Sequence, residues 1–235
     1  MQLLIDLDVV IYRIGFACQK KNEDGVIVAE PVRYALYSLK RYVETMIKST
    51  KADSSRLFLT GKGNFRMAID GEYKANRTDT AKPIHYDALR EYAMKHMKAE
   101  MIHGMEADDK LALCQTEDTM IATTDKDLKM VAGRHYNFVK KEYQTLTQEQ
   151  GTHWFYMQML MGDKADNIPG IKGIGPKKAE KLLAESTDWD ATVESQYENF
   201  FGEGWFQRMC QNTQLLWMLQ KNVKMPMNIN NKGEL

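Results

Sequence analysis

Short apolar runs alternate with amphipathic segments through the first 146 residues. Four compact runs have the pattern of buried strands: residues 2–6, 56–60, 118–122 and 135–139. Apolar residues at helical spacing occur in three segments between or after them: 32–47, 86–97 and 107–114. Strands that alternate with helices predict an α/β core with a mostly parallel central sheet flanked by helices.

From residue 147 onward the pattern becomes almost wholly helical, most clearly at 154–161 and 177–185. The sequence therefore predicts an α/β domain over residues 1–146 and a helical region over residues 147–235. The polar stretch 22–25 predicts a turn, and residues 228–235 predict a loose tail.

Four short clusters contain nine acidic residues, several of them placed where a strand ends. The nine are Asp6, Asp8, Glu106, Asp108, Asp109, Asp125, Asp127, Asp163 and Asp166. Each cluster alone has an ordinary alternative: a strand end that meets water, a first helical turn, a helix cap or a solvated turn. In an α/β fold, however, strand ends converge on one edge of the sheet. Carboxylates gathered there would need counter-charge, and hard oxygen ligands of this kind suit Mg²⁺ or Mn²⁺.

Composition agrees with a folded globular protein and adds one point about charge. The 235 residues are 43% hydrophobic, with 32 basic and 32 acidic side chains. If the nine clustered acids form one site, 23 acidic residues remain against 32 basic ones, an excess of nine positive charges over the rest of the chain. The neutral total is therefore compatible with an acidic centre in a basic surface and a nucleic-acid partner.

The cysteines and the first residues of the sequence predict the cellular compartment of the protein. The three cysteines form neither a disulfide framework nor a zinc spacing, which favours a reducing environment. No apolar run approaches the length of a membrane span, and no charged segment precedes the first apolar run. We expect a cytoplasmic protein with no membrane partner.

The segment 167–178 is rich in glycine, proline and lysine. It is not a nucleotide-hydrolase phosphate loop, because Pro176 occupies the lysine position, and it is not a calcium loop, because Ala165 replaces a ligand. Its glycines predict a tight hairpin whose amides could cradle a phosphate at a helix start. Four lysines add attraction to a DNA backbone: Lys172, Lys177, Lys178 and Lys181.

A second basic stretch contains Lys62, Arg66, Lys74, Arg77 and Lys82, interleaved with Phe65 and Tyr73. Aromatic rings among cations are typical of sites for single strands or frayed ends. A solvated loop is the competing interpretation.

Together these motifs resemble those of the 5′-nuclease superfamily, the 5′–3′ exonucleases and flap endonucleases, and most of all its stand-alone bacteriophage members. Three segments carry the resemblance in the family's order and spacing: Glu106-Ala107-Asp108-Asp109, Thr124-Asp125-Lys126-Asp127-Leu128, and Gly162 to Gly175. Residues 73–77 match the basic motif at the family's helical arch, which places the arch region at about 62–95. The resemblance runs from about Leu3 to Leu183.

The resemblance implies a PIN-like nuclease core and a helix-three-turn-helix element over about 160–185 that grips duplex DNA, often with K⁺ on its carbonyls. It implies one Mg²⁺ held by Asp6, Glu106 and Asp108, with Asp109 nearby, and a second held by Asp125, Asp127, Asp163 and Asp166. It also implies that Lys74 and Arg77 hold the scissile phosphate and the 5′ strand. Expected DNA contacts are Arg66, Tyr73, Lys74, Arg77, Lys172, Gly173, Gly175, Lys177 and Lys178.

One departure from the family concerns the second strand, which usually ends in an aspartate. Leu59-Thr60-Gly61 supplies no acid there. Asp8 could substitute as a ligand, since it shares a face with Asp6 if the first strand continues through both; alternatively, Asp8 caps a helical turn that begins near Val9.

The resemblance therefore implies a monomeric, phage-encoded, Mg²⁺-dependent 5′–3′ exonuclease or flap endonuclease, with catalytic roles for Asp6, Asp108, Asp125, Lys74 and Arg77. Its substrate would be DNA with 5′ ends, flaps, nicks or branches, in replication or repair. One alternative is a catalytically silent DNA-binding protein that has lost a metal site; another is a metal-dependent RNA nuclease.

Overall fold

The computed structural model describes residues 1–77 and 81–227, so the expected tail at 228–235 lies outside the described residues. The chain forms two compact units. The first contains residues 1–63, 80–128 and 133–146, and the second contains residues 64–79, 129–132 and 147–235. Residues 64–79, which the sequence assigned to the α/β core, therefore group with the second unit.

The first unit is built on a six-stranded sheet in the order β5-β4-β1-β6-β7-β8. The strands are β1 (Gln2–Asp6), β4 (Ser54–Thr60), β5 (Glu100–Ile102), β6 (Thr119–Ala122), β7 (Gly133–Asn137) and β8 (Glu142–Leu146). All neighbouring pairs are parallel except β7 and β8. The four predicted strands are present, each within two residues of its expected ends, and the predicted fold class is confirmed.

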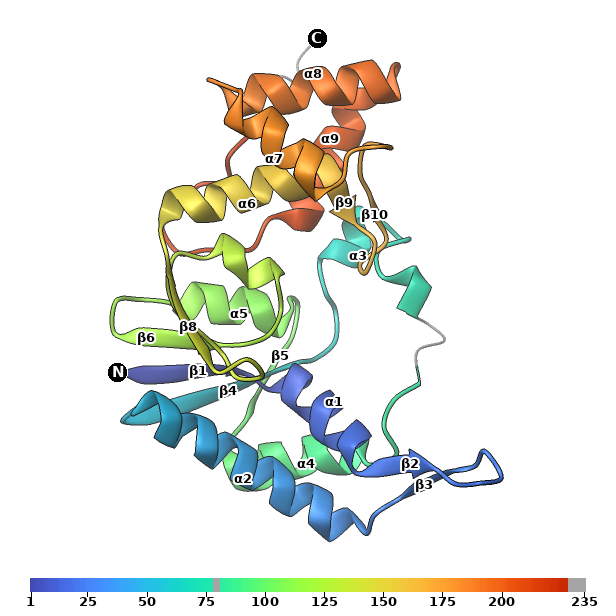
Figure 1. Ribbon diagram of the computed structural model, residues 1–235, viewed down its shortest axis with the longest axis vertical. Coiled ribbons are helices and arrows are strands. Elements are labelled where there is room, and N and C mark those ends of the chain that lie inside the picture. Colours follow the sequence, from blue (N-terminus) through green and yellow to red (C-terminus); the bar gives the residue numbers. More distant parts are fainter. Residues whose placement is uncertain (78–80, 228–235) are drawn as a thin grey trace. The chain divides into compact units, whose positions relative to one another are not determined.

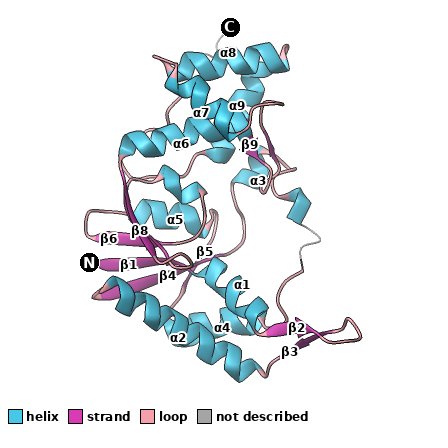
Figure 2. Ribbon diagram, viewed as in Figure 1, coloured by secondary structure: helices cyan, strands magenta, loops and turns pink. Residues whose placement is uncertain are grey.

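Helices cover both faces of this sheet. α1 (Leu7–Ala17), α2 (Val32–Thr50) and α4 (Tyr86–Met97) pack together on one face, and α5 (Ala107–Cys114) lies on the other (Figure 1; Figure 2). Because both faces are covered, the last four residues of β1 are all buried, as is typical of a central parallel strand. β1 thus places Asp6 at the carboxyl edge of the sheet, at the end of a buried central strand.

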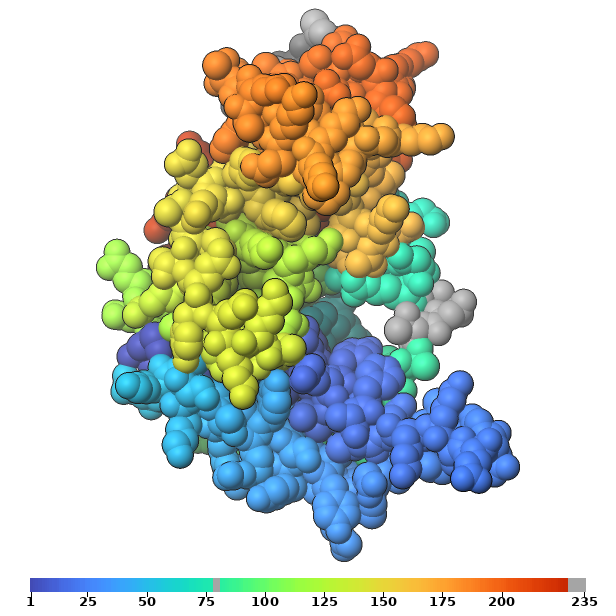
Figure 3. Space-filling model, viewed as in Figure 1, coloured from blue at the N-terminus to red at the C-terminus, as the bar shows by residue number. Residues whose placement is uncertain are grey.

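A two-stranded hairpin follows α1, formed by β2 (Gln19–Lys21) and β3 (Ile27–Ala29). The predicted turn at 22–25 lies at its tip. The hairpin projects from the rest of the first unit, at the lower right of Figure 3.

The second unit is mostly helical, as predicted from residue 147 onward. Its main helices are α6 (Gln148–Met161), α7 (Pro176–Ala184), α8 (Trp189–Phe201) and α9 (Trp205–Leu216). Shorter elements complete it: α3 (Arg66–Ile69), the 3-10 helix η1 (Ala75–Arg77), β9 (Gly162–Asp163) and β10 (Ile168–Pro169). The 3-10 helix η2 (Asp127–Met130) lies where the chain passes from the first unit to the second.

Two glycines determine how α6 continues into the β9–β10 hairpin. A Cβ atom on Gly162 would lie 2.2 Å from the Gly170 backbone nitrogen, and one on Gly170 would lie 2.0 Å from the Met161 carbonyl carbon. Gly162 also has a φ of +67°, which disfavours other residues. The two backbones can therefore approach only because both positions lack a side chain.

All three cysteines are free. Within the described ranges, none of the helices combines the length and the apolar character that crossing a membrane requires.

Candidate active site

Asp6 is the last residue of β1 and is only 2% exposed. Its Oδ1 accepts a hydrogen bond from the Val9 backbone N–H at 3.3 Å, and its Oδ2 accepts one from the Thr123 hydroxyl at 2.8 Å. The strand does not continue through Asp8, because α1 begins at Leu7 with Asp6 as its N-cap. The expectation of one extended strand presenting both acids on one face is therefore wrong, and so is the expectation that Asp8 provides the cap.

The surroundings of Asp6 are unfavourable to its negative charge. Burial, followed by the nearby carboxylates of Asp8 and Asp125, raises the pKa of Asp6 to about 7, against an ordinary value of 3.8. A cation beside these carboxylates would offset both their mutual repulsion and the desolvation. By its chemistry, this donor set fits a hard divalent cation.

The second acid cluster begins α5. Glu106 is its N-cap, and the Glu106 and Asp109 side chains form a capping box with each other's backbone N–H groups. Asp109 is fully buried, and its Oδ2 accepts the Glu106 N–H at 3.2 Å. Asp109 thus stabilises the start of α5, where Glu106 is the N-cap and Asp108 lies in the first turn.

The third cluster follows β6. The Asp125 N–H donates to the Thr123 hydroxyl at 2.9 Å, and the Asp127 N–H donates to Asp125 Oδ1 at 2.9 Å. Thr123 therefore links this turn to Asp6 at the end of the neighbouring strand β1. The predicted convergence of strand ends is confirmed for Asp6 and Asp125.

Asp8 has two protein partners. Its Oδ1 pairs with Arg90 at 2.7 Å, and its Oδ2 accepts the Thr60 backbone N–H at 2.7 Å. Beside Thr60, Gly61 has no room for a side chain, because a Cβ there would lie 2.6 Å from the Ile102 carbonyl oxygen. The backbone at this strand end therefore excludes an acid at position 61. Asp8 stabilises the end of β4 through its hydrogen bond with the Thr60 N–H.

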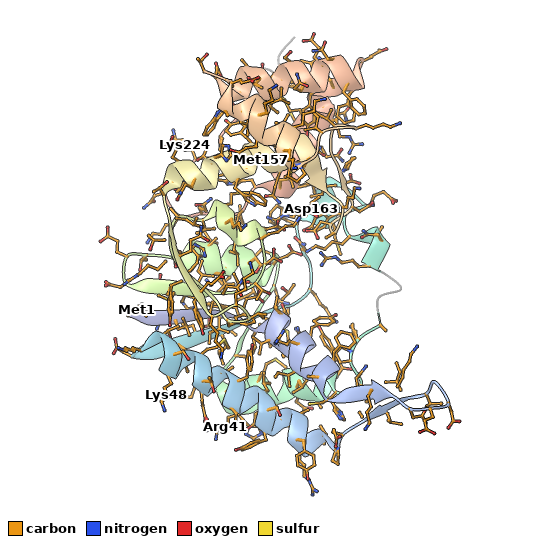
Figure 4. The ribbon with its side chains drawn as sticks, viewed as in Figure 1. Met1, Arg41, Lys48, Met157, Asp163 and Lys224 are labelled. Carbon is orange, nitrogen blue, oxygen red and sulfur yellow. The ribbon has the colours of Figure 1, made fainter. Side chains whose placement is uncertain are left out.

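The fourth cluster belongs to the second unit. Asp163 ends β9, just beyond α6 (Figure 4), and is 2% exposed; its Oδ1 accepts the Ala165 N–H at 2.8 Å. Asp166, 7% exposed, accepts a hydrogen bond from the Tyr73 hydroxyl at 3.0 Å and forms ion pairs with Lys74, at 3.5 Å, and with Arg77.

Backbone contacts hold the basic segment 72–77 against residues 164–167, which contain Asp166 of the fourth acid cluster. The Lys74 N–H donates to the Asp166 carbonyl at 2.9 Å, and Arg77 Nε donates to the Ala165 carbonyl at 2.9 Å. The Asn76 side chain donates to the Lys164 carbonyl at 2.8 Å. The sequence does not reveal this contact between segments about ninety residues apart; the opposite charges of the two motifs are its only trace.

Two expected DNA contacts are buried. Arg66 is 3% exposed and donates to the carbonyls of Leu215 and Trp217, each at 2.8 Å, at the C-terminal end of α9. Tyr73 is 4% exposed, with its hydroxyl on Asp166. The expectation that these two side chains form part of an open basic and aromatic surface is wrong. Arg66 instead neutralises the end of a helix dipole.

The glycine-rich hairpin leaves its lysines exposed. Ile171 and Ile174 are each 6% exposed and anchor the loop, whereas Lys172, Lys177 and Lys178 are exposed. Gly173 has a φ of +84°, and Gly175 is the N-cap of α7 with Pro176 in the first turn. A Cβ on Gly173 or Gly175 would meet nothing within 4 Å, so the backbone is open to a ligand here.

The hairpin is also held by α9, in the region where the sequence offered no motif. The fully buried Asn212 donates to the Pro169 carbonyl at 2.7 Å and to the Tyr197 hydroxyl at 2.8 Å. α9 therefore supports both the hairpin, through Asn212, and α3, through Arg66.

The predicted metal ligands are divided between the two units. Seven of the nine acids, Asp8 among them, lie in the first unit, and Asp163 and Asp166 lie in the second. In the part of the chain that the structure describes, no group of three or more His, Cys, Asp or Glu side chains is arranged to hold a metal ion. The chemistry of the donors fits Mg²⁺, and the two ligand sets stay predictions.

Two family models match the chain. The 5′–3′ exonuclease N-terminal resolvase-like domain matches residues 1–156, and the 5′–3′ exonuclease C-terminal SAM fold matches residues 150–231. The chain belongs to the 5′–3′ exonuclease family. The family predicted from the acid clusters and the glycine hairpin is therefore confirmed.

Curated relatives of this family member include bacterial DNA polymerases. DNA polymerase I of Streptococcus pneumoniae is 28% identical over 225 residues, covering 85% of this chain and 25% of the relative. The thermostable DNA polymerase I of Thermus aquaticus is 29% identical over 213 residues, covering 82% of this chain and 25% of the relative. The chain spans about a quarter of the length of the curated relatives it matches.

Solved structures agree in fold. A bacteriophage T5 flap endonuclease, in a pseudo-enzyme–product complex with DNA and metal ions, has a TM-score of 0.67 at 18% identity, covering 93% of this chain and 89% of that chain. The catalytic core of Rad2 in complex with a DNA substrate has a TM-score of 0.53 at 16% identity, covering 90% of this chain and 69% of that chain.

Proposed function

We propose that this 5′–3′ exonuclease family member is a divalent-metal-dependent nuclease that hydrolyses DNA phosphodiesters near 5′ ends or at flap junctions. The observation that carries the proposal, in a chain of this family, is the buried carboxyl of Asp6 at the end of β1, which Thr123 links by hydrogen bonds to the turn that contains Asp125. A covered sheet edge that accumulates acids in this way is suited to a metal-dependent reaction.

In this proposal, Asp6, Glu106 and Asp108 hold one Mg²⁺, and Asp125, Asp127, Asp163 and Asp166 hold a second. Mn²⁺ would substitute. The bound ions would lower the pKa of a water and stabilise the attacking and leaving oxygens. Asp109 and Thr123 orient these ligands through the capping box of α5 and the hydrogen bond to Asp6.

The basic residues divide into two groups. Lys172, Lys177 and Lys178 are exposed around the open hairpin backbone and would bind duplex phosphates. Lys74 and Arg77 lie on Asp166 and would stabilise charge on the phosphate that is cleaved. K⁺ on the hairpin carbonyls, a monomeric state and a phage-encoded, cytoplasmic origin belong to the same proposal.

A catalytically silent DNA-binding protein of the same fold is the second candidate. Gly61 favours it, because the contact with the Ile102 carbonyl leaves no space for an acid at position 61, directly after β4. That protein would bind flap DNA through the same lysines and cut nothing.

One assay separates these functions. The protein is incubated with Mg²⁺ and end-labelled 5′-flap DNA, blunt duplex, single-stranded DNA and an RNA hairpin, and the products are mapped. The proposal expects cleavage of the DNA near 5′ ends or at the flap junction, with 5′-phosphate products. Tight binding without cleavage would support the silent alternative, and preferential cleavage of the RNA would contradict both.

A further inference from the structure

Thr60, the last residue of β4, is held at both of its backbone polar groups by side chains. Its N–H donates to Asp8 Oδ2 at 2.7 Å, and its carbonyl accepts from Arg90 at 2.6 Å. A second nitrogen of Arg90 donates to Asp8 Oδ1 at 2.7 Å. The three residues thus form a closed ring of hydrogen bonds in which every donor has its acceptor.

The end of the neighbouring strand explains why this ring is needed. The register of β4 with β1 stops at Phe58, opposite Asp6, because the chain turns into α1 at Leu7. A β4 residue beyond that point has no partner on the β1 side, although Thr60 still pairs with Ile102 of β5 on its other side, and an unpaired buried amide or carbonyl is costly. Asp8 on α1 and Arg90 on α4, with side chains 22% and 13% exposed, replace the missing strand.

The side chain of Thr60 points to a different element. Its Oγ1 accepts the Ala107 N–H at 3.0 Å. Ala107 is the first residue of α5, and the first N–H groups of a helix have no partner within the helix. Thr60 therefore fastens the first turn of α5, beside the capping box of Glu106 and Asp109.

The chemistry next to this contact is that of the acid cluster. Glu106 precedes Ala107 and Asp108 follows it, so the hydroxyl of Thr60 fixes the backbone between two of the carboxylates proposed as metal ligands. Outer contacts of this kind orient metal ligands and, when removed, weaken metal binding by about 10- to 100-fold.

We propose that Thr60 is a positioning residue: Asp8 and Arg90 fix its backbone, and its hydroxyl fixes Glu106 and Asp108 for metal binding. The end of β4 contributes to the site through a neutral hydroxyl and the α5 backbone, without a carboxylate of its own. This inference rests on the proposed function, since it names how that site is held in shape.

The test compares Thr60→Val, which keeps the shape and removes the hydroxyl, with Thr60→Ser, which keeps the hydroxyl. Mn²⁺ binding to each protein is measured by titration calorimetry without DNA, together with hydrogen exchange of the Ala107 amide. We expect Thr60→Val to bind Mn²⁺ about tenfold more weakly and to exchange the Ala107 amide faster, whereas Thr60→Ser stays within about twofold of wild type. Thermal unfolding monitors folding, and Thr60→Ala replaces Thr60→Val, with the same expectation, if the valine variant does not fold.

The outcomes separate this inference from the proposed function. If wild type binds Mn²⁺ and the variant without the hydroxyl binds it equally well, the positioning role is wrong while the metal site stands. Wild type that neither binds Mn²⁺ nor cuts DNA would overturn the proposed function, and the positioning role with it. Equal losses in Thr60→Val and Thr60→Ser would also contradict the role of the hydroxyl.

Discussion

Lys74 contacts Asp166 twice: its ammonium group lies 3.5 Å from Oδ2, and its backbone N–H donates to the Asp166 carbonyl at 2.9 Å. With Arg77 on the other carboxylate oxygen, Asp166 neutralises cations that would otherwise attract a phosphate. The basic motif and the fourth acid cluster therefore form one local structure.

This pairing predicts that Asp166→Asn strengthens DNA binding without metal while it lowers Mg²⁺-dependent cleavage. The asparagine keeps the shape of the side chain but releases the charge of Lys74 and Arg77. Affinity for 5′-flap DNA in excess chelator, measured by fluorescence anisotropy, should rise by about 1 kcal/mol, or roughly fivefold in Kd. The comparison is Asp163→Asn, which removes a buried acid of the same hairpin. Weaker binding by Asp166→Asn than by Asp163→Asn would contradict the prediction.

The lysines of the glycine hairpin should determine the affinity for duplex DNA. Lys177→Ala with Lys178→Ala should weaken binding to duplex DNA and reduce the slope of log affinity against log salt by about one for each phosphate that is no longer neutralised. Lys48→Ala, an exposed lysine on α2 (Figure 4), serves as the control and should leave the slope unchanged. Equal slopes in the hairpin variant and the control would remove the hairpin from the DNA interface.

Lys74 should instead affect chemistry. Lys74→Ala should lower the single-turnover cleavage rate by a larger factor than it lowers affinity, because the cation is proposed to act on the charge that develops at the phosphate. Rates and affinities are compared with those of the hairpin variant. If both variants show the same ratio of the decrease in rate to the decrease in affinity, the division of roles is wrong.

Arg66 should contribute to stability. Its buried guanidinium satisfies two carbonyls at the end of α9, so Arg66→Met removes both hydrogen bonds and should lower the free energy of unfolding by about 3 kcal/mol. Urea unfolding measures this, with Lys62→Met, an exposed position, as a control expected within about 0.5 kcal/mol of wild type. An Arg66→Met protein of normal stability that binds DNA poorly would restore Arg66 as a DNA contact.

The raised pKa of Asp6 predicts a pH dependence of stability in the metal-free protein. The folded carboxyl keeps its proton up to about pH 7, whereas the unfolded one loses it near 3.8. The native state therefore binds more protons in this window, and its stability, full below about pH 4, should fall as the pH rises to about 7. Urea unfolding at several pH values in chelator tests this, and Asp6→Asn should flatten the dependence. A metal-free protein that gains stability across this window through Asp6 would contradict the assignment.

Much of the fold follows from local pattern. β1, α4 and α5 begin and end where the apolar spacing predicts, because each buries apolar residues at that spacing. β8 was not predicted: four of its five residues are exposed, so it carries no apolar alternation. β5 has only three half-buried residues and is equally inconspicuous in the sequence.

The sequence predicts which residue types form the candidate site, but it does not predict which of them contact one another. Three of the four acid clusters could be grouped because each follows a strand or begins a helix. The contacts of Arg66 with α9, of Asp8 with Arg90 and of Tyr73 with Asp166 join residues far apart in the chain, and no periodicity encodes them. From the sequence alone, an arginine that binds DNA cannot be told apart from one that, like Arg66, donates to the carbonyls at the end of a helix.

Metal dependence is tested by single-turnover cleavage of a labelled 5′-flap DNA by the wild-type protein, first in excess chelator and then after Mg²⁺ or Mn²⁺ is restored. A nuclease that depends on the carboxylates around Asp6 and Asp163 should bind the flap but not cut it in chelator, and should regain its full rate with either ion. Cleavage in excess chelator at the rate seen with Mg²⁺ would contradict the proposal that this protein is a metal-dependent nuclease.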